Sequence, residues 1–138
     1  MRIERLDHLV LTVKSIDESV RFYGDVLGMD IQTFGQGRKA AKFGLQKINF
    51  QEVGHEIDPK ADKPMPGSAD FCLIVNDSLQ EVLRQLKEHC IEPVLGPVER
   101  TGALGPMQSV YIRDPDDNLV ELSSYGPHVR ITNRDELK

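Results

Sequence analysis

The chain has 138 residues and carries 17 lysines and arginines against 22 aspartates and glutamates, a formal net charge of −5. Its hydrophobic share of 39% and charged share of 28% are typical of one folded globular domain. The acidic balance argues against nucleic acid or an anionic membrane surface as partner, since either requires a basic face. No apolar run approaches the ~20 residues of a membrane span, and the N-terminus lacks the apolar segment of a secretory signal. We therefore expect a cytoplasmic protein.

The first half of the chain predicts one strand, one helix and three further strands. Apolar residues alternate over 6–13, which predicts a strand buried on one side. Ser15 and Glu18 match a helix-start capping box, and apolar residues then recur at helical spacing until Gly28. This pattern predicts a single α-helix. Three short strands separated by glycines are expected after it, over 30–34, 39–43 and 47–53.

The second half predicts the same order of elements after a linker at 54–67, which contains three prolines. A strand is expected over 68–75, followed by a helix that Ser78 caps and that ends near Cys90. We interpret both cysteines, Cys72 and Cys90, as small core residues without a disulfide. The last three strands are expected over 92–95, 109–113 and 118–125, and the polar segment 126–138 as a C-terminal tail.

The repeated order indicates an internal duplication. Pairing His8 with Asp70 superimposes the strand and helix patterns of the two halves, although few residues are identical. The fold class that follows is α+β, with two tandem βαβββ modules at 4–53 and 68–125 that together make a single domain. Each module is expected to form a curved open sheet with a helix on one face. The two uncovered faces can then enclose a cup, which is where a ligand would bind.

Polar side chains mark the uncovered faces. The first strands carry His8 and Asp70, the last strand of the second half carries Glu121, and the corresponding strand of the first half carries Asn49 and Gln51 on one side. Nitrogen and oxygen donors that converge on a cup would suit a divalent cation with positions left open for substrate. The alternatives are a hydrogen-bonded core histidine, a solvated strand start at Asp70 and ordinary strand polarity.

Three motifs carry a resemblance to a known family: Leu6-Asp7-His8-Leu9-Val10-Leu11, then Phe22-Tyr23 with Leu27-Gly28-Met29, then Asp114-Pro115-Asp116-Asp117-Asn118-Leu119-Val120-Glu121-Leu122. Together with the doubled order they resemble the vicinal-oxygen-chelate (VOC) superfamily of glyoxalase, bleomycin-resistance and dioxygenase type, most of all its glyoxalase-domain proteins. The resemblance covers residues 4–125. It implies that His8, Gln51, Asp70 and Glu121 are metal ligands and that the chain forms a homodimer. Asp70 departs from the histidine common at its position, and Gln51 from the usual Glu or His.

The resemblance implies a metal-dependent glyoxalase-like lyase or isomerase that acts on a small carbonyl compound or its thiol adduct. Mn, Ni, Co, Zn or Mg would stabilise an enediolate, Glu121 would be the catalytic base, and a thiol such as glutathione is a candidate co-substrate. One alternative is a non-catalytic binding module of the bleomycin-resistance type, and another is a fosfomycin-type thiol transferase. A dioxygenase is disfavoured because the two-His-one-carboxylate set is incomplete.

Positive side chains that could bind an acidic substrate are few. Arg38 belongs to a basic group with Lys39, Lys42 and Lys47, and Arg100 precedes a glycine-rich segment. A solvated surface is the simple explanation for them. If either arginine faces the cup, it could hold a carboxylate or phosphate in a bidentate manner. Arg38 and Arg100 are therefore our candidate substrate-binding residues.

Overall fold

The computed structural model describes residues 1–126, so the expected C-terminal tail lies, from residue 127 on, outside the described residues. The chain divides into two compact units, and we treat each by itself. Unit 1 comprises Met1–Ala69 together with Pro115–Asp117, and unit 2 comprises Asp70–Asp114 together with the segment from Asn118 onward. Within the described part of the chain, no helix is both long and apolar enough to cross a membrane.

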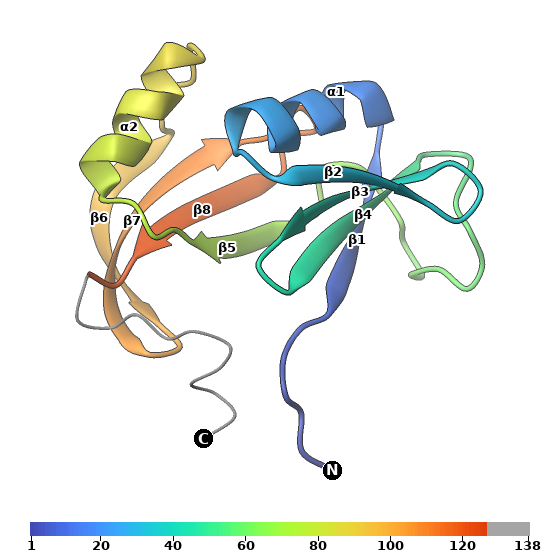
Figure 1. Cartoon of the computed structure of the whole chain (residues 1–138), viewed down its shortest axis with the longest axis horizontal. Helices are drawn as coiled ribbons and strands as arrows, with labels where there is room; N and C mark the ends of the chain where they lie inside the picture. The colour runs from blue at the N-terminus through green and yellow to red at the C-terminus, as the bar shows by residue number, and fades with distance from the viewer. Residues whose placement is uncertain (127–138) are drawn as a thin grey trace. The chain divides into compact units, whose positions relative to one another are not determined.

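Unit 1 is a four-stranded mixed sheet with one helical segment (blue to green in Figure 1). The sheet order is β1-β4-β3-β2, where β1 runs parallel to β4 and the other neighbours are antiparallel. Parallel pairing of the first and last strands follows from the helical crossover between them. The elements are β1 (His8–Val13), α1 (Ile16–Val20), the π-helical η1 (Arg21–Val26), β2 (Asp30–Phe34), β3 (Arg38–Phe43) and β4 (Gln46–Glu52).

Unit 2 repeats this topology (yellow-green to red in Figure 1). Its sheet order is β5-β8-β7-β6, again with a parallel pair, β5 and β8, and antiparallel neighbours. The elements are β5 (Asp70–Ile74), α2 (Leu79–Glu88), β6 (Leu95–Gly102), β7 (Gly105–Arg113) and β8 (Leu119–Ser124). The prediction of an α+β fold with two tandem βαβββ modules is confirmed.

The core of unit 1 is aromatic. Tyr23 is fully buried, and its ring lies 5.0 Å from that of Phe22 and 5.6 Å from that of Phe50. The prediction of one continuous α-helix was wrong here, because α1 passes into the π-helix η1, in which the Leu27 N–H donates to the Phe22 carbonyl at 3.1 Å. A wider π turn brings consecutive side chains closer to one face. It therefore lets both neighbouring aromatic residues enter the core.

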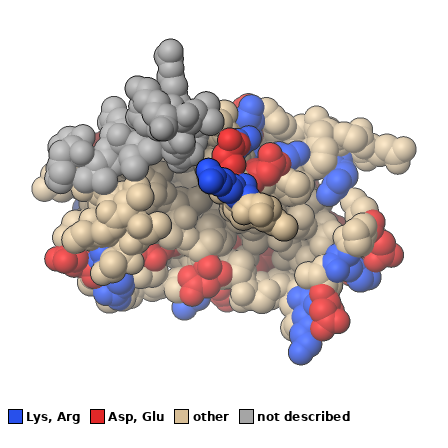
Figure 2. All heavy atoms as spheres, turned by 90° about the horizontal axis from the view of Figure 1, so that it is seen from below, with Lys and Arg blue, Asp and Glu red and all other residues tan. Residues whose placement is uncertain are grey.

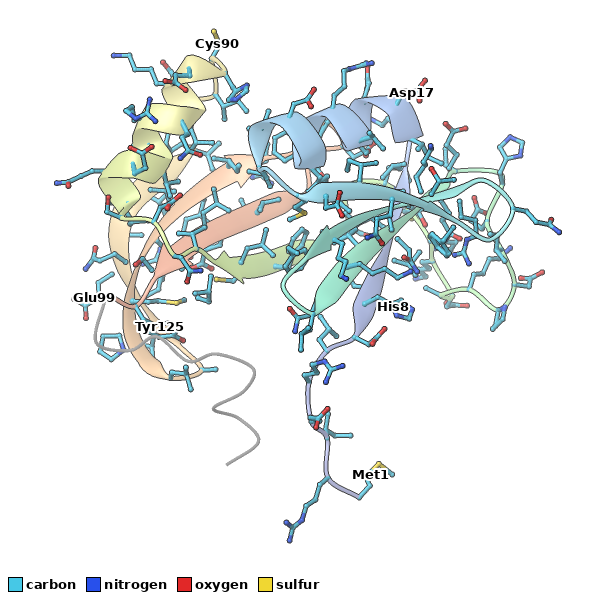
Figure 3. The ribbon with its side chains drawn as sticks, viewed as in Figure 1. Met1, His8, Asp17, Cys90, Glu99 and Tyr125 are labelled. Carbon is cyan, nitrogen blue, oxygen red and sulfur yellow. The ribbon has the colours of Figure 1, made fainter. Side chains whose placement is uncertain are left out.

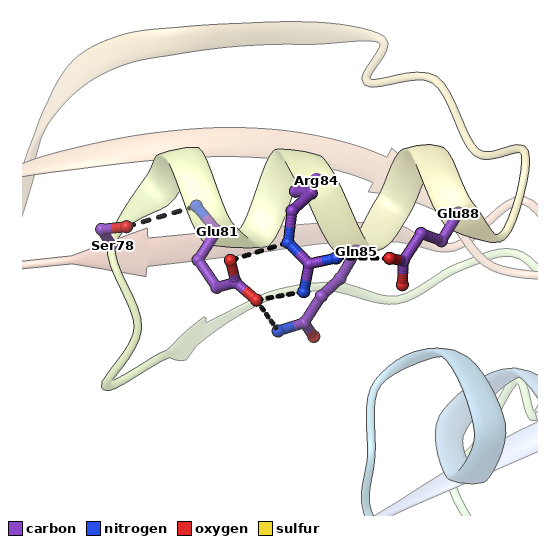
Figure 4. Close-up of polar contacts among 5 residues, drawn as sticks. All are labelled: Ser78, Glu81, Arg84, Gln85 and Glu88. Atoms are coloured by element: carbon purple, nitrogen blue, oxygen red, sulfur yellow. Dashed lines mark hydrogen bonds and ion pairs between the residues drawn. The ribbon is translucent and has the colours of Figure 1, made fainter.

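The core of unit 2 is aliphatic, and it lies between the sheet and α2. Buried side chains there are Val82, Leu86, Val110, Ile112, Val120 and Leu122. The predicted cap of α2 is confirmed, since Ser78 Oγ accepts the Glu81 N–H at 3.2 Å. On the exposed side, the Glu81 carboxylate binds Arg84 and Gln85, and Arg84 also pairs with Glu88 (Figure 4). The hydrogen bonds from Arg84 and Gln85 lower the pKa of Glu81 to about 2.

Two further expectations for unit 2 were wrong. The strand expected over 92–95 is instead β6, which begins at Leu95 and continues through Gly96-Pro97 at a break in register. Proline is tolerated in a sheet at an edge or a bulge, and β6 is the edge strand. Neither cysteine is a core residue: Cys72 and Cys90 are both free and exposed in this chain.

Candidate functional site

The sheet of unit 1 has one face that the helical segment does not cover, which we call open face 1. Strand alternation places Ile48 and Phe50 in the core and therefore Lys47, Asn49 and Gln51 on open face 1. Because β1 and β4 are parallel and in register, His8 lies beside Lys47 on this face. Open face 1 thus contains two of the predicted metal ligands, His8 and Gln51.

His8 projects from the start of β1 (Figure 3), and its side chain is 45% exposed. Its Nδ1 lies 2.8 Å from a carboxylate oxygen of Asp7. This hydrogen bond is the main reason why the pKa of Asp7 is lowered. A histidine whose Nδ1–H is held by a carboxylate presents the lone pair of Nε2, and metal-binding histidines are oriented in this way. His8 therefore has the side-chain setting of a metal ligand.

Gln51 does not have that setting. Its Nε2 donates to Thr12 Oγ1 at 2.9 Å, and its Oε1 accepts the Ile57 N–H at 3.1 Å, in a buried position. In register it pairs with Thr12, four positions beyond His8, which at ~3.3 Å per residue is about 13 Å along the strand. The structure therefore does not bring His8 and Gln51 together, and Gln51 ties β1 to the loop after β4.

Asn49 is the polar residue of β4 nearest to His8 in register. It pairs with Val10, only two positions beyond His8, so the two side chains are diagonal neighbours on open face 1. Asn49 is 4% exposed, and its Oδ1 has no hydrogen-bond partner among the described residues. Burying an amide oxygen without a partner is costly unless a ligand or water meets it. Sequence reasoning placed Asn49 on this face but did not select it.

Unit 2 has a corresponding open face 2, on which both remaining ligand candidates lie. Asp70 is exposed at the start of β5 and pairs with Leu119, while Glu121 pairs with Cys72. Asp70 and Glu121 are thus diagonal neighbours, two positions apart in register, as His8 and Asn49 are in unit 1. By register, the counterpart of Glu121 is Asn49, and the counterpart of Gln51 is Ser123.

A chain of side-chain hydrogen bonds holds Glu121 on open face 2. Ser123 Oγ donates to Glu121 Oε2 at 3.2 Å, and it lies 2.6 Å from Ser109 Oγ and 3.2 Å from Cys72 Sγ. With its one proton given to Glu121, Ser123 accepts from both of these neighbours. Burial raises the pKa of the Cys72 thiol, and the charge of Glu121 raises it further. Cys72 is therefore a neutral donor here, and Glu121 Oε1 makes no hydrogen bond within the described residues.

The turn before β8 is built by its own acidic residues. The Asn118 backbone N–H and side-chain amide donate to the two carboxylate oxygens of Asp114, at 2.9 and 2.8 Å. In unit 1, Asp116 Oδ1 accepts the Lys14 N–H at 3.0 Å. The acidic motif at 114–118 thus has structural contacts that fix where β8 begins and so where Glu121 lies.

The two predicted substrate-binding arginines have different surroundings. Arg100 Nε donates to the Tyr111 hydroxyl at 2.9 Å, and its guanidinium lies 5.5 Å from that ring. Tyr111 pairs directly with Glu121, so this arginine and the candidate base belong to one face of unit 2. Arg38 lies in unit 1, 4.8 Å from the ring of Phe34. The structure thus assigns one arginine to each open face.

The donor set can be tested against a divalent metal ion. Within residues 1–126, no three His, Cys, Asp or Glu side chains converge on one point, so neither unit alone forms a complete site. Each unit has one diagonal pair on its own open face: His8 and Asn49 in unit 1, Asp70 and Glu121 in unit 2. The unpartnered oxygen of Asn49 and the free Nε2 edge of His8 fit a cation that prefers nitrogen and oxygen ligands. Gln51 does not fit.

Two βαβββ units with a polar pair at equivalent register positions define a glyoxalase-type fold. A family profile described as Glyoxalase/Bleomycin resistance protein/Dioxygenase superfamily matches residues 5–122. The chain is 52% identical over 125 residues to the glyoxalase domain-containing protein RDO1 of Mycosarcoma maydis, which covers 91% of this chain and 70% of that protein. The chain therefore belongs to the glyoxalase, bleomycin-resistance and dioxygenase superfamily.

Solved structures show the same fold. The virulence protein STM3117 of Salmonella typhimurium has a TM-score of 0.89 and 52% identity, covering 91% of this chain and 100% of that chain. An integron cassette protein from the mobile metagenome of V. cholerae has a TM-score of 0.89 and 47% identity, over 91% of this chain and 98% of that one. A lactoylglutathione lyase from Agrobacterium tumefaciens has a TM-score of 0.68 and 22% identity, over 90% and 96% of the respective chains. That last likeness concerns the fold alone.

Proposed function

We propose that this chain is a divalent-metal-dependent lyase or isomerase of glyoxalase type, which acts on a small carbonyl compound or its thiol adduct. The observation that carries the proposal is the buried, unpartnered Oδ1 of Asn49, at the register position that Glu121 occupies in unit 2. Each open face carries a ligand-type pair at the same register positions, which supports a ligand-binding role for those positions. Mn, Ni, Co, Zn or Mg would suit its mixed nitrogen and oxygen donors.

In this proposal His8, Asp70, Glu121 and Asn49 hold the metal, and Asn49 replaces the predicted Gln51. A bound divalent ion would polarise the substrate carbonyl and lower the cost of removing the adjacent proton. Glu121 moves that proton through Oε1, because Oε2 accepts the hydrogen bond of Ser123. Asn49 cannot act as a base, since its amide does not take up a proton at neutral pH. Unit 1 therefore contributes binding, and the proton transfer belongs to unit 2.

The test is the Glu121→Gln variant, which keeps the shape of the side chain and removes its charge. We expect metal affinity to fall by more than about 100-fold, beyond the range for losing an outer partner of a ligand. Metal binding is measured by isothermal titration with Mn²⁺ and Ni²⁺, and folding by circular dichroism. The control is Glu99→Gln on β6. Glu99 is an exposed carboxylate that pairs with Gln108, and Gln108 lies on the opposite face of the sheet from Ser109.

Turnover is tested with 2-oxoaldehydes in the presence and absence of glutathione. Metal-dependent conversion that Glu121→Gln abolishes is the expected outcome, and the glutathione requirement identifies the thiol adduct as substrate. Unchanged metal uptake in Glu121→Gln, with the fold intact, would contradict the proposed ligand set.

A second candidate is a non-catalytic small-molecule binding module. A cavity of about 510 Å³ in unit 2 favours it, lined by the largely apolar side chains of Leu79, Leu104, Pro106, Met107 and Tyr125 among others. An antibiotic-binding protein of Streptomyces shares the fold at 18% identity and a TM-score of 0.69. Metal analysis of the purified protein separates the two, because a binding module of this kind needs no stoichiometric metal ion.

We further propose that residues 4–125 act as one domain, that the chain works as a homodimer, and that it does so in the cytoplasm. Exposed and unpaired Cys72 and Cys90 support a reducing compartment. On the side of the molecule shown in Figure 2, basic and acidic side chains are interspersed, which supports a small-molecule ligand over nucleic acid. Light scattering of the purified protein at several concentrations tests the dimer.

A further inference from the structure

Three side chains on unit 1 form what we call the Phe34 cluster: Arg38, Phe34 and Lys47. Lys47 Nζ lies 3.8 Å and Arg38 Cζ 4.8 Å from the centroid of the same Phe34 ring. Arg38 and Phe34 pair across β3 and β2, and Lys47 lies on β4 beside His8. All three side chains are half-buried. Both positive charges therefore lie against one aromatic ring and are at most about 9 Å apart.

The Phe34 cluster lies on open face 1. Ala40, which pairs with Asn49, is fully buried and lies two positions from Arg38 on β3, so their side chains share a face. Lys47 and Asn49 share that face on β4. The cluster therefore lies on the same face as His8 and Asn49, the two ligand candidates of unit 1.

The two positive charges of the Phe34 cluster form no short ion pair within residues 1–126, although the charge of Lys47 is one of the lesser causes that lower the pKa of Asp7. Neither Arg38 nor Lys47 forms an ion pair with a described residue, and the Arg38 Nε is buried without a hydrogen-bond acceptor. Lys42 is directly opposite Lys47 on the neighbouring strand, an arrangement of like charges that is unfavourable. The nearby carboxylate of Asp7 is bound to His8. Open face 1 thus carries three basic side chains, Arg38, Lys42 and Lys47, whereas its strands carry one carboxylate on this face, Asp30, which lies opposite Lys42 rather than in the Phe34 cluster.

Lys39 shows that this group of basic side chains is confined to open face 1. It precedes Ala40 on β3 and points to the other face, where its Nζ donates to Thr33 Oγ1 at 2.7 Å. Strand alternation thus places the adjacent residues Arg38 and Lys39 on opposite faces of the sheet. Only Arg38, Lys42 and Lys47 remain on the side of the ligand candidates.

We propose that the Phe34 cluster binds the anionic group of a small organic ligand, a carboxylate or a phosphate, and that the substrate is therefore an acid. The guanidinium of Arg38 supplies directed N–H donors, its unpartnered Nε among them, and Lys47 supplies a second positive charge across the ring. The identity of this ligand as the substrate rests on the proposed function. Binding of the anion itself does not, because it requires only unit 1 and no metal.

The experiment uses the full chain treated with a chelator, with inorganic phosphate, lactate and propionate as probes. Binding is followed by shifts of backbone amide signals in two-dimensional NMR at constant ionic strength. We expect saturable shifts on β2, β3 and β4, and a preference among the probes that shows whether phosphate or carboxylate is favoured. Arg38→Gln should weaken binding about tenfold, and Lys47→Gln about threefold. Arg38→Lys should restore only part of the affinity, because it returns the charge without the directed donors.

The matched control is Lys39→Gln, which removes the same charge from the adjacent position on the opposite face. It should change the dissociation constant less than twofold. Equal weakening by Lys39→Gln and Arg38→Gln would show a diffuse charge effect and overturn the proposal, as would the absence of saturable shifts for all three probes. Adding Mn²⁺ afterwards separates the hypotheses: anion binding that persists in a protein unable to bind metal would refute the proposed function and leave the anion site standing.

Discussion

Open face 1 and open face 2 have the same backbone register but different side chains. In unit 1 the diagonal pair is His8 and Asn49, an imidazole and an amide, and Arg38, Lys42 and Lys47 lie on the same face. In unit 2 the equivalent pair is Asp70 and Glu121, and the Ser123 hydroxyl, which accepts from the Cys72 thiol, donates to the glutamate. The duplication has therefore preserved positions while the chemistry at those positions has diverged.

This difference in side chains indicates which chemical roles each face can take. A carboxylate can neutralise a cation and transfer a proton, whereas an amide can only donate or accept hydrogen bonds or ligate. Open face 2, with its two carboxylates, therefore suits cation binding and proton transfer. Open face 1 suits neutral coordination and recognition of an anionic ligand. Variants that exchange or remove these side chains test the comparison.

The largest expected effect concerns the two cores that support these faces. Unit 1 depends on the Tyr23 ring, which packs against Phe22 and Phe50, whereas unit 2 is filled by aliphatic side chains. Tyr23→Ala should lower the free energy of unfolding by about 3–5 kcal/mol, since it removes a large buried ring and leaves a cavity. Urea denaturation followed by circular dichroism measures the loss.

The matched change in unit 2 is Ile112→Val, which removes one methylene from a fully buried side chain. It should cost only about 0.5–1.5 kcal/mol. A Tyr23→Ala cost no larger than that of Ile112→Val would show that the aromatic cluster does not dominate the stability of unit 1.

The next prediction compares the effects of replacing Asn49 and Gln51 on metal affinity and on stability. Asn49→Ala should weaken metal binding about tenfold or more and change stability little, because its Oδ1 has no hydrogen-bond partner to lose. Gln51→Ala should do the opposite: it breaks two buried hydrogen bonds, which costs about 1–3 kcal/mol, and leaves metal affinity within twofold. Titration calorimetry gives the metal affinity of each variant, and thermal melts give its stability. If Gln51→Ala weakened metal binding and Asn49→Ala did not, Gln51 would be the ligand.

Sequence patterns predicted the fold well because each half carries complete local signals. The capping serines Ser15 and Ser78 both accept the expected N–H, and the strand alternation placed His8, Asp70 and Glu121 on their uncovered faces. The order of elements could therefore be derived before any coordinates. The π-helical turn at Arg21–Val26 could not, since it follows from packing two adjacent aromatic residues into one core.

The sequence could not distinguish the settings of Asn49 and Gln51, for a physical reason. Alternation places Asn49 and Gln51 on one face and cannot say which of them lies beside His8. That choice depends on the register between β1 and β4, which joins residues about forty positions apart and is set by tertiary packing. The correspondence between Asn49 and Glu121 emerges only from the pairing of β4 with β1 and of β8 with β5, because the offset that matches His8 with Asp70 does not align these two strands.

A smaller effect concerns the orientation of His8. In unit 1, Asp7 orients this imidazole through a hydrogen bond, whereas the diagonal pair of unit 2 contains no imidazole. Asp7→Asn should reduce metal affinity by about tenfold, the range for an outer-shell partner, because the ring is then less firmly held in the tautomer that presents Nε2. Titration calorimetry with Mn²⁺ measures the change. Asp17→Asn on α1 serves as a control that removes a charge from the same unit away from the site, and an equal effect would point to net charge alone.

The smallest effect distinguishes the two helices. Helix α2 carries the Glu81, Arg84 and Glu88 ion pairs, whereas α1 has acidic residues in its first turn and no basic residue in its last. Arg84→Gln should lower the melting temperature by only about 1–3 °C at pH 7, because exposed ion pairs contribute little. The pKa of Glu81 is lowered from 4.5 to about 2, so the contribution of this pair is present above pH 4.5 and is lost as the pH falls toward 2. Melting curves of the parent and Arg84→Gln should therefore converge between these pH values, while Lys87→Gln, on the same helix, should show no such convergence.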